Sequence, residues 1–435
     1  MDMYQKIIEA ADAVTPKLIL QRRDFHKYAE PGWQEMRTSS IIARQLTELG
    51  YEVLVGEQVC LRSARMGVPA EAVLENAYQR ALEQGADEEF VKVTRGGMTG
   101  VIGILRCGEG PTVALRFDID ALGVYESQDE DHFPAAEGFA SVNSGVMHAC
   151  GHDGHAVSGL GVAQVLMQIK EQLHGTVKLI FQPSEEGVRG AKSIVEKGHL
   201  DDVDFFLGAH TTAEDDEGSD VTPGSTGALA TGKYDVVFTG RAAHAGGEPH
   251  LGRNALQAAA AAVMSLYGIP RHGAGASRIN VGKLVAGSGR NVIADEAFME
   301  LEVRGVSTEI NDYMCRHAMQ ILEHTAAMYE CTVEVREMGG AEAMFCTPEL
   351  MERVAKISAE KLGLKVSENL LEDMGGSEDV SYMTNRVQKN GGQATFIRVR
   401  SPQKAGAHNR KYDFDESYIP KSIKIFCATV YDLMK

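Results

Sequence analysis

The sequence lacks any run of about 18 consecutive apolar residues, so no membrane-spanning helix is predicted. Its first residues also lack the charged-then-apolar pattern of a secretory signal. Basic charge is in deficit, because 43 Lys and Arg face 61 Asp and Glu, for a formal net charge of −18. This balance argues against nucleic acid or an anionic membrane as a partner. An anionic substrate would therefore need a locally basic pocket.

A disulfide framework is also missing. The seven cysteines are scattered at positions 60, 107, 150, 315, 331, 346 and 427, and their number is odd. Reduced thiols in a cytoplasmic protein fit this pattern best. At 435 residues the chain is too long for one ordinary core, so we expect two domains.

Four side chains that can bind metal lie between Met147 and His155, where the chain reads Met-His-Ala-Cys-Gly-His-Asp-Gly-His. They are His148, Cys150, His152 and His155. Crowding imidazoles and a thiol adds no stability, because each must be desolvated or left at the surface. Neutral imidazole and thiolate are good ligands for zinc and its first-row neighbours. The alternative is a His-rich polar loop without metal.

Three apolar runs rich in β-branched residues lead into polar residues. They are 112–117, followed by Asp118 and Asp120; 176–181, followed by Glu185 and Glu186; and 204–209, followed by His210. A helix is predicted over about 156–173, and the strand–helix–strand alternation predicts a mainly parallel sheet. Ligands bind at the carboxyl ends of such strands, so we expect these polar groups to converge.

A second unit is predicted over 228–342. Its strands are expected at 233–241, 278–286, 294–305 and 332–338, and its helices at 254–267 and 309–329. The order βαββαβ is that of a ferredoxin-like unit. We therefore expect an α/β protein with a metal-binding catalytic domain over 1–227 and 343–435 and an inserted ferredoxin-like domain. Residues 56–95 form an early excursion to which the sequence assigns no chemistry.

The adjacent Glu185 and Glu186 add a second chemical signal. Neighbouring residues on an extended or turning backbone point in different directions, so one carboxylate can bind metal while the other faces substrate. Metal-assisted hydrolysis needs a carboxylate base beside a metal-bound water. A Glu-Glu pair alone is weak evidence, and a lone histidine such as His210 is more often structural. The position of both at strand ends gives them weight.

The run from Met147 to His155, together with Phe181-Gln-Pro-Ser-Glu-Glu-Gly187, resembles the amidohydrolase branch of the dinuclear-metal aminoacylase and carboxypeptidase family. Similar stretches, such as Arg22-Arg-Asp-Phe-His26, run along nearly the whole chain. The resemblance implies hydrolysis of the amide bond of a small N-acyl amino acid, with p-aminobenzoyl-glutamate, giving p-aminobenzoate and glutamate, as the best substrate. Hippurate-like or N-acetyl amino acids are the alternative substrates. A non-catalytic ligand-binding relative is the alternative from another functional class.

The resemblance also implies a site with two divalent metal ions per chain, manganese or zinc. The ligands would be Cys150, between the ions, with His152, His210, Glu186 and His408. Glu185 would be the general base and acid. Asp118 and Asp120 stand where sister branches have a ligand histidine and an orienting aspartate. We expect Asp120 to accept a hydrogen bond beside a ligand or, alternatively, to be a carboxylate in a strand-end turn, and His155 to orient the loop.

For the inserted domain, the resemblance implies a role in dimerisation. His244 would reach across a homodimer interface to polarise the scissile carbonyl, with help from Asn291. Two neutral donors aimed at a developing oxyanion lower the barrier. Arg304 would bind the substrate carboxylate, since a guanidinium recognises a carboxylate through two hydrogen bonds. A heteromer with a related subunit is the alternative to the homodimer.

Overall fold

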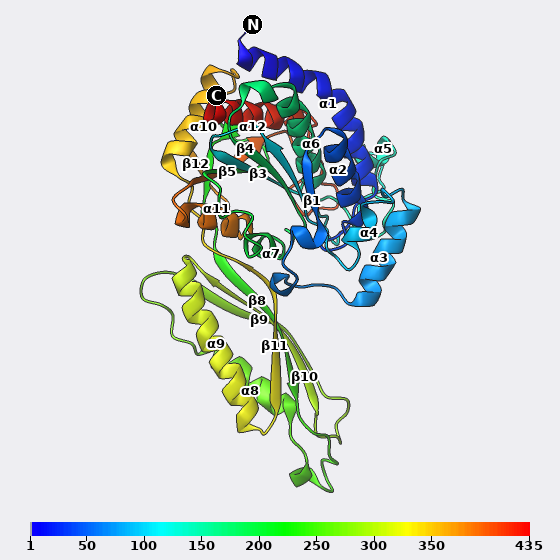
Figure 1. Cartoon of the computed structure of the whole chain (residues 1–435). Helices are drawn as coiled ribbons and strands as arrows, with labels where there is room; N and C mark the ends of the chain where they lie inside the picture. Colours follow the sequence, from blue (N-terminus) through cyan, green and yellow to red (C-terminus); the bar gives the residue numbers. More distant parts are fainter. Residues whose placement is uncertain (1) are drawn as a thin grey trace. The chain divides into compact units, whose positions relative to one another are not determined.

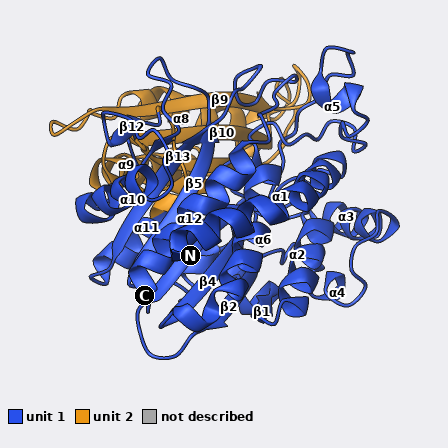
Figure 2. Cartoon of the chain, turned by 90° about the horizontal axis from the view of Figure 1, so that it is seen from above, with its two compact units in different colours: residues 1–226, 345–374, 382–435 blue, residues 227–344, 375–381 orange. Residues whose placement is uncertain are grey.

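The computed structural model describes residues 2–435 and divides into two compact units (Figures 1 and 2). The first unit comprises the residues up to 226, then 345–374 and 382–435, and the second comprises 227–344 and 375–381. Each unit has its own sheet and its own apolar core. The chain therefore leaves the first unit, builds the second and returns.

A seven-stranded sheet forms the centre of the first unit, in the order β1-β2-β4-β3-β5-β13-β6. The strands are β1 (Glu52–Val55), β2 (Val101–Arg106), β3 (Thr112–Asp118), β4 (Thr176–Gln182), β5 (Phe205–Thr212), β6 (Val221–Thr222) and β13 (Gln393–Arg400). The four central strands β4, β3, β5 and β13 are parallel, whereas β1, β2 and β6 pair antiparallel. The α/β prediction is confirmed, but the sheet is mixed: only its centre, where strands are buried on both faces, is parallel.

Most helices belong to the first unit. They are α1 (Met3–Lys27), α2 (Met36–Glu48), α3 (Glu71–Glu83), α4 (Val91–Thr94), α5 (Phe133–Ala136), α6 (His152–Gln168), α7 (Ala191–Val195), α10 (Pro348–Glu360), α11 (Val380–Lys389) and α12 (Tyr418–Met434). Helices α6 and α12 pack on the sheet, and α1 packs on both of them. A Cβ atom at Gly159 would lie 2.7 Å from the rings of Phe117 and Phe181, so glycine lets α6 approach the strands closely.

Helix α6 begins earlier than its apolar pattern predicted. The sequence placed its start at about 156, whereas the helix starts at His152 and ends at Gln168. Its first turn is polar yet buried, which hides it from a search for apolar spacing. Gly151, at φ 87°, adopts the left-handed backbone that precedes this turn.

The early excursion, which contains α3 and α4, contacts α7 and the segment just before it. Trp33, a fully buried side chain, donates its indole N–H to the carbonyl oxygen of Met66 at 2.8 Å. The N–H of Leu61 donates to the carbonyl of Ser193 at 2.9 Å. Arg189 donates to the carbonyls of Glu186 and Gly67 at 2.9 and 3.4 Å. The excursion therefore supports the loop that carries the two adjacent glutamates.

The second unit has a four-stranded antiparallel sheet in the order β11-β8-β10-β9. Its elements are β8 (Ala230–Thr239), α8 (Ala255–Tyr267), β9 (Ser277–Ala286), β10 (Glu296–Gly305), α9 (Thr308–Met328) and β11 (Thr332–Ala341). The side chains of Asn254 and Ser307 cap α8 and α9 by accepting backbone N–H bonds. Both helices pack on the sheet and on each other.

In the first unit, a short parallel pair of strands, β7 (Gly224–Thr226) and β12 (Leu371–Asp373), completes the strands described.

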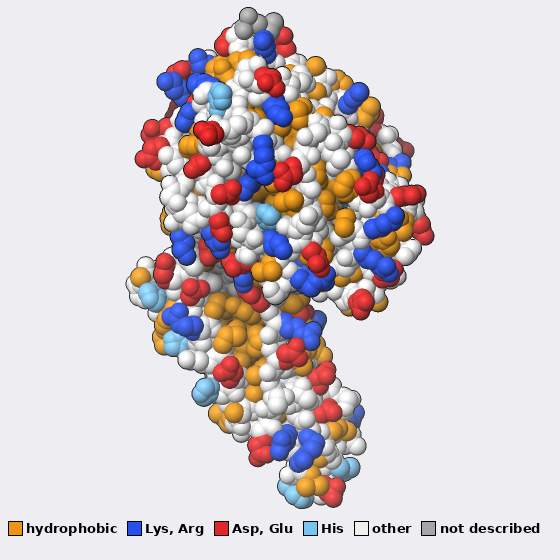
Figure 3. Space-filling view, viewed as in Figure 1, with side chains coloured by type: hydrophobic (Ala, Val, Ile, Leu, Met, Phe, Trp, Pro, Cys, Tyr) orange, Lys and Arg blue, Asp and Glu red, His pale blue; other side chains and the backbone are white. Residues whose placement is uncertain are grey.

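Within residues 2–435, no helix combines the length and apolarity that crossing a membrane requires. On the face shown in Figure 3, acidic and basic side chains are interspersed over both units.

Candidate metal centre and active site

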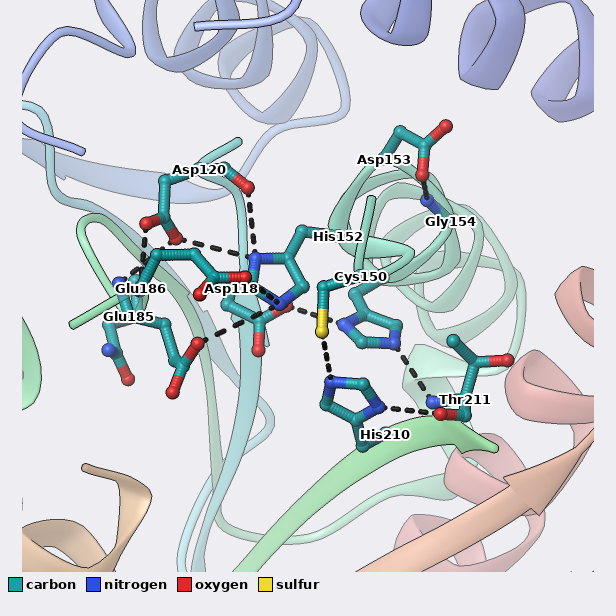
Figure 4. A network of polar contacts seen from close by, with 12 residues as sticks. Asp118, Asp120, Cys150, His152, Asp153, Gly154, Glu185, Glu186, His210 and Thr211 are labelled. Carbon is teal, nitrogen blue, oxygen red and sulfur yellow. Dashed lines mark hydrogen bonds and ion pairs between the residues drawn. The ribbon is translucent and has the colours of Figure 1, made fainter. Parts of the chain in front are cut away.

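Polar side chains of the first unit meet at the carboxyl ends of the parallel strands, and Figure 4 shows those that surround His152 and Cys150. Five groups have ligand atoms within 4.8 Å of one another, and three of them consist only of the expected residues: Cys150 with His152 and His210, Cys150 with Glu186 and His408, and His152 with Glu185 and Glu186. These groups share members, so the five expected ligands and the expected base form one connected cluster. Strands β3, β4, β5 and β13 each lead to part of it, as the topology of a parallel sheet requires.

His152 is oriented with one ring nitrogen towards the centre of the cluster. Its Nδ1 donates to the carbonyl oxygen of Asp120 at 2.9 Å, and its buried Nε2 makes no hydrogen bond within residues 2–435. Nε2 lies 3.8 Å from Glu185 Oε2 and 4.0 Å from Glu186 Oε1. A buried polar atom without a hydrogen bond is rare, and this one fits an atom that coordinates a metal.

The electrostatics of the cluster favour a cation at this point. Burial opposes the charged form of His152, but Asp118, Asp120 and Cys150 outweigh it and raise the pKa of His152 well above its ordinary value. The carboxylates of the cluster would also attract a divalent ion. A bound ion would displace the extra proton, because a ligand imidazole is neutral.

Cys150 and His210 form the second part of the cluster. The Cys150 Sγ atom lies 3.4 Å from His210 Nε2, and His210 Nδ1 donates to the carbonyl of Thr211 at 2.6 Å. Burial lowers the pKa of His210 well below its ordinary value and raises that of Cys150 to about 11. His210 is therefore ready as a neutral ligand, whereas Cys150 must release a proton to bind metal. Contrary to the sequence interpretation, His210 lies within β5, which continues to Thr212.

His408 joins the cluster from the loop after β13. Its Nε2 lies 3.7 Å from Glu186 Oε1, and its side chain is 57% exposed. Its backbone adopts φ 66°, an unfavourable value for a residue with a side chain. Its N–H donates to the carbonyl of Ala149 at 2.7 Å, which holds this loop beside Cys150.

Two histidines of the motif lie outside the expected ligand set. His155 donates from Nδ1 to Asp118 at 2.5 Å and accepts at Nε2 from the N–H of Thr211 at 3.0 Å. Asp118 is also bound by Arg116 at 2.6 Å. His155 therefore ties α6 to β3 and β5, and Asp118 anchors it. His148 is buried, and neither ring nitrogen forms a hydrogen bond within residues 2–435.

Asp120 combines the two roles that the sequence left as alternatives. Its carbonyl oxygen accepts the hydrogen bond from His152, and its carboxylate accepts the backbone N–H groups of Glu185 and Glu186, both at 2.9 Å. The sequence showed an aspartate at a strand end but not which amides it would bind, since these residues are 65 and 66 positions away.

A buried charged network lies behind the loop that carries Cys150 and His152. Asp153, which follows His152, accepts hydrogen bonds at 2.8 Å from both Arg22 and His26. The other ring nitrogen of His26 lies 2.9 Å from Glu126. Burial opposes the charged form of His26, but Asp153 and Glu126 raise its pKa to about 9. The sequence contained the Arg22–His26 stretch only as part of a family resemblance and indicated no contact for it.

We expect His26→Gln to remove a pH-dependent contribution to stability. The pKa of His26 is raised from 6.5 to about 9 on folding, so the contribution is complete below the unfolded value and is lost as the pH rises through about 9. The difference in unfolding free energy between wild type and variant should shrink by about 3 kcal/mol from about pH 6 to about pH 10. Urea unfolding across this range measures it, and a constant difference would contradict the charged state of His26.

In the second unit, His244 lies in the segment that follows β8, and Asn291 lies in the segment that precedes β10. The two segments are adjacent, since His244 forms an antiparallel bridge with Val292. His244 and Asn291 are both exposed, and the N–H of Ala245 donates to the Asn291 carbonyl at 3.0 Å. His244 Nδ1 accepts N–H bonds from Gly246 and Gly247 at 3.1 and 2.9 Å. The neutral ring must therefore carry its proton on Nε2, which makes that atom a hydrogen-bond donor.

Arg304 lies at the other end of the same strands. In the pairing of β10 with β8, Arg304 lies opposite Thr231. At the other end of this pairing, where the chain leaves β8 towards His244, Thr239 lies opposite Glu296. Eight residues at about 3.4 Å each separate the two pairs by about 27 Å. His244 and Arg304 of one chain are thus too far apart to contact the same small substrate. Arg304 donates to Glu302 at 2.9 Å and is partly exposed.

Known proteins are similar to this chain over nearly its whole length. The chain is 43% identical to a p-aminobenzoyl-glutamate hydrolase subunit of Escherichia coli (strain K12), over 98% of both chains. It is 45% identical to the indole-3-acetyl-aspartic acid hydrolase of Enterobacter agglomerans, over 95% of both chains. The crystal structure of an aminobenzoyl-glutamate utilization protein from Klebsiella pneumoniae superposes with a TM-score of 0.84 at 38% identity, covering 98% of this chain and 97% of that one.

The model of one peptidase family matches most of the chain, over residues 114–432. This range contains most of β3, all of β4, β5 and β13, and all five expected ligands. The chain belongs to Peptidase family M20/M25/M40.

Proposed function

We propose that this protein is a metal-dependent amidohydrolase that cleaves the amide bond of N-acyl amino acids, with p-aminobenzoyl-glutamate as its substrate. The observation that carries the proposal is the connected cluster of five ligand side chains with a further carboxylate, Glu185, beside it. The names of two similar proteins, a p-aminobenzoyl-glutamate hydrolase and an indole-3-acetyl-aspartic acid hydrolase, both describe an acyl group on an acidic amino acid.

Two divalent ions, manganese or zinc, fit the donor set of thiol, imidazole and carboxylate. His152 and His210 would hold one ion and Glu186 and His408 the other, with Cys150 as a further ligand. When bound, the ions would lower the pKa of the attacking water and neutralise charge on the carbonyl oxygen. The buried Nε2 of His152, which makes no hydrogen bond within residues 2–435, supports this assignment.

Glu185 is the proposed general base and acid. It would accept a proton from the attacking water as the oxygen bonds to the acyl carbon, then return that proton to the amine nitrogen as the amide bond breaks. Its backbone N–H is held by Asp120, so its main chain is anchored while its carboxylate lies 3.8 Å from His152. The neighbouring Glu186 is left to bind metal.

The second unit is proposed to be a ferredoxin-like dimerisation domain, which its βαββαβ order and its strand order support. Strand β9 lies at the edge of the sheet, where an unpaired backbone can bind another strand. Large apolar side chains are exposed on β9 and α8: Leu284, Val285, Leu256, Met264 and Tyr267. A homodimer formed through these elements would cover them. A heteromer with a related subunit is the alternative, to be distinguished by the mass of the purified assembly.

In such a dimer, His244 would act in the site of the partner subunit. Its Nε2–H donor and the side chain of Asn291 would face the carbonyl oxygen on which negative charge develops. The separation of about 27 Å between the pairs that mark His244 and Arg304 supports the use of these residues in different sites.

Replacing Arg304 with alanine is expected to raise KM for substrates with a free α-carboxylate by about 10- to 100-fold, because a charge-assisted pair is lost. An amide-capped analogue lacks the carboxylate, so its hydrolysis should change little. Steady-state kinetics on both substrates test the role. Equal losses on the two would exclude carboxylate recognition by Arg304.

The proposed function is tested by release of p-aminobenzoate from p-aminobenzoyl-glutamate. Purified protein is stripped of metal and reloaded with manganese or with zinc, and indole-3-acetyl-aspartate, hippurate and N-acetyl-glutamate are assayed in parallel. Metal-dependent release from the first substrate supports the proposal. Hydrolysis of only one of the other compounds would show that the enzyme acts on a different N-acyl amino acid from the one proposed. If none of the compounds is hydrolysed, a ligand-binding protein is favoured.

A further inference from the structure

We infer that Glu35 is a positioning residue for the reaction: together with Asp120 it holds three consecutive backbone amides at Ser184, Glu185 and Glu186 and so aims the Glu185 carboxylate. The inference rests on the proposed function of Glu185. Its structural part can be tested without any activity.

The turn that carries Glu185 is under backbone strain. Ser184 adopts φ 53° and Val188 φ 60°, the left-handed values that side chains disfavour. Such conformations persist only where the surroundings hold them. Space is tight as well, because a Cβ atom at Gly32 would lie 2.5 Å from Ser184 Oγ. The turn therefore depends on its neighbours for its shape.

Two buried carboxylates supply the holding contacts. The Ser184 N–H donates to Glu35 Oε1 at 2.7 Å, and the next two N–H groups donate to Asp120 at 2.9 Å each. Glu35 Oε2 lies 2.7 Å from the Thr99 hydroxyl, which donates to it. Glu35 is fully buried and Asp120 is 1% exposed. Every amide from Ser184 to Glu186 is thus bound by an acid from a different part of the chain.

Placing two acids here is unfavourable for folding, which points to a function. Burial and the nearby charge of Asp120 raise the pKa of Glu35 to about 8. The contacts of the Glu35 side chain are hydrogen bonds, from the Ser184 N–H and the Thr99 hydroxyl at 2.7 Å each. Buried polar groups that break the local rule are expected at functional sites.

Glu30 provides a matched control within the same loop. It is also a buried carboxylate, 1% exposed, and it accepts two consecutive N–H groups, from Arg37 and Thr38 at 3.0 and 2.8 Å. These amides belong to the first turn of α2, whereas Glu35 holds the turn of Glu185. Replacing Glu30 or Glu35 with alanine removes two hydrogen bonds in each case. A difference in kcat between the two variants would therefore reflect the positioning of Glu185 by Glu35.

The test compares Glu35→Ala, Glu35→Gln and Glu30→Ala in the full-length, metal-loaded protein. Hydrogen exchange should accelerate for a peptide spanning 183–190 in Glu35→Ala but not in Glu30→Ala. A displaced base can cost up to about 100-fold in rate, so Glu35→Ala should lower kcat by about 10- to 100-fold with KM and bound metal unchanged. Glu35→Gln keeps an oxygen acceptor for Ser184 and should restore most of kcat.

Three results would overturn the inference: wild-type exchange at 183–190 in a folded Glu35→Ala, wild-type kcat in that variant, or an equal loss of kcat in Glu30→Ala. If Glu35→Ala does not fold, Thr99→Val removes only the hydroxyl that holds Glu35 and should produce the same changes on a smaller scale. If the wild type hydrolyses none of the substrates, the proposed function fails, and the exchange data alone decide whether Glu35 holds the turn.

Discussion

Replacing Glu185 with glutamine is expected to lower kcat for p-aminobenzoyl-glutamate by about 10²- to 10⁴-fold, the range that a positioned general base contributes. The amide side chain has nearly the shape of the carboxylate but cannot accept a proton from water. Glu185 lies 3.8 Å from His152 and beside Glu186 in the cluster, so it is placed to act on a water bound there. The backbone hydrogen bond from Glu185 to Asp120 does not involve the altered side chain.

Metal content distinguishes a loss of kcat caused by removal of the base from one caused by loss of the bound metal. We expect Glu185→Gln to retain its metal, measured by elemental analysis, whereas Glu186→Gln should lose metal together with activity. Glu196→Gln is the surface control, because Glu196 is half-exposed and pairs only with Arg386 among the ion pairs described for residues 2–435. Retention of full kcat in Glu185→Gln would refute its role as the base.

Arg22→Met is expected to destabilise the protein by about 3–5 kcal/mol, the range for removing one partner of a buried ion pair. Arg22 is fully buried and donates to Asp153 and Asp413 at 2.8 and 2.7 Å. Its guanidinium also lies over the ring of Phe414, 4.4 Å from the centroid. Methionine fills part of the volume but leaves Asp153 with less compensation for its charge.

The neighbouring Arg23 provides the matched control. It pairs with Glu416 at 2.9 and 2.8 Å, but its side chain is 26% exposed. Arg23→Met should therefore cost no more than about 1 kcal/mol, as for other solvent-exposed ion pairs. Denaturant unfolding of both variants measures the difference. Equal effects would show that burial of the network does not control stability.

The proposed metal ligands were accessible from the sequence because chemistry-bearing residues stand out where a strand ends. Cys150 and His152 lie within one short run, and Glu186 follows an apolar strand. His408 was assigned only through the family resemblance, since a histidine in a loop has no signal of its own. The structure brings all of these to one cluster.

The residues that hold the ligands could not be predicted. Asp120 binds amides 65 and 66 positions away, and Glu35 binds an amide 149 positions away. No periodicity or spacing connects such partners, because the contact is created only when the segments after β3 and β4 and the segment before α2 come together in the fold. The start of α6 was missed for a related reason: its buried first turn is polar and is stabilised by partners from other elements.

The sequence by itself determined the alternation of strands and helices, the six elements of the second unit and the kinds of side chain available for catalysis, because these follow from local patterns of apolar and polar residues. Only the tertiary structure decided that the seven-stranded sheet is antiparallel at its edges. It also decided which nitrogen of His152 faces the cluster and which acids hold the turn that carries Glu185. Those features depend on contacts between distant segments, and their geometry is set by packing rather than by neighbouring residues.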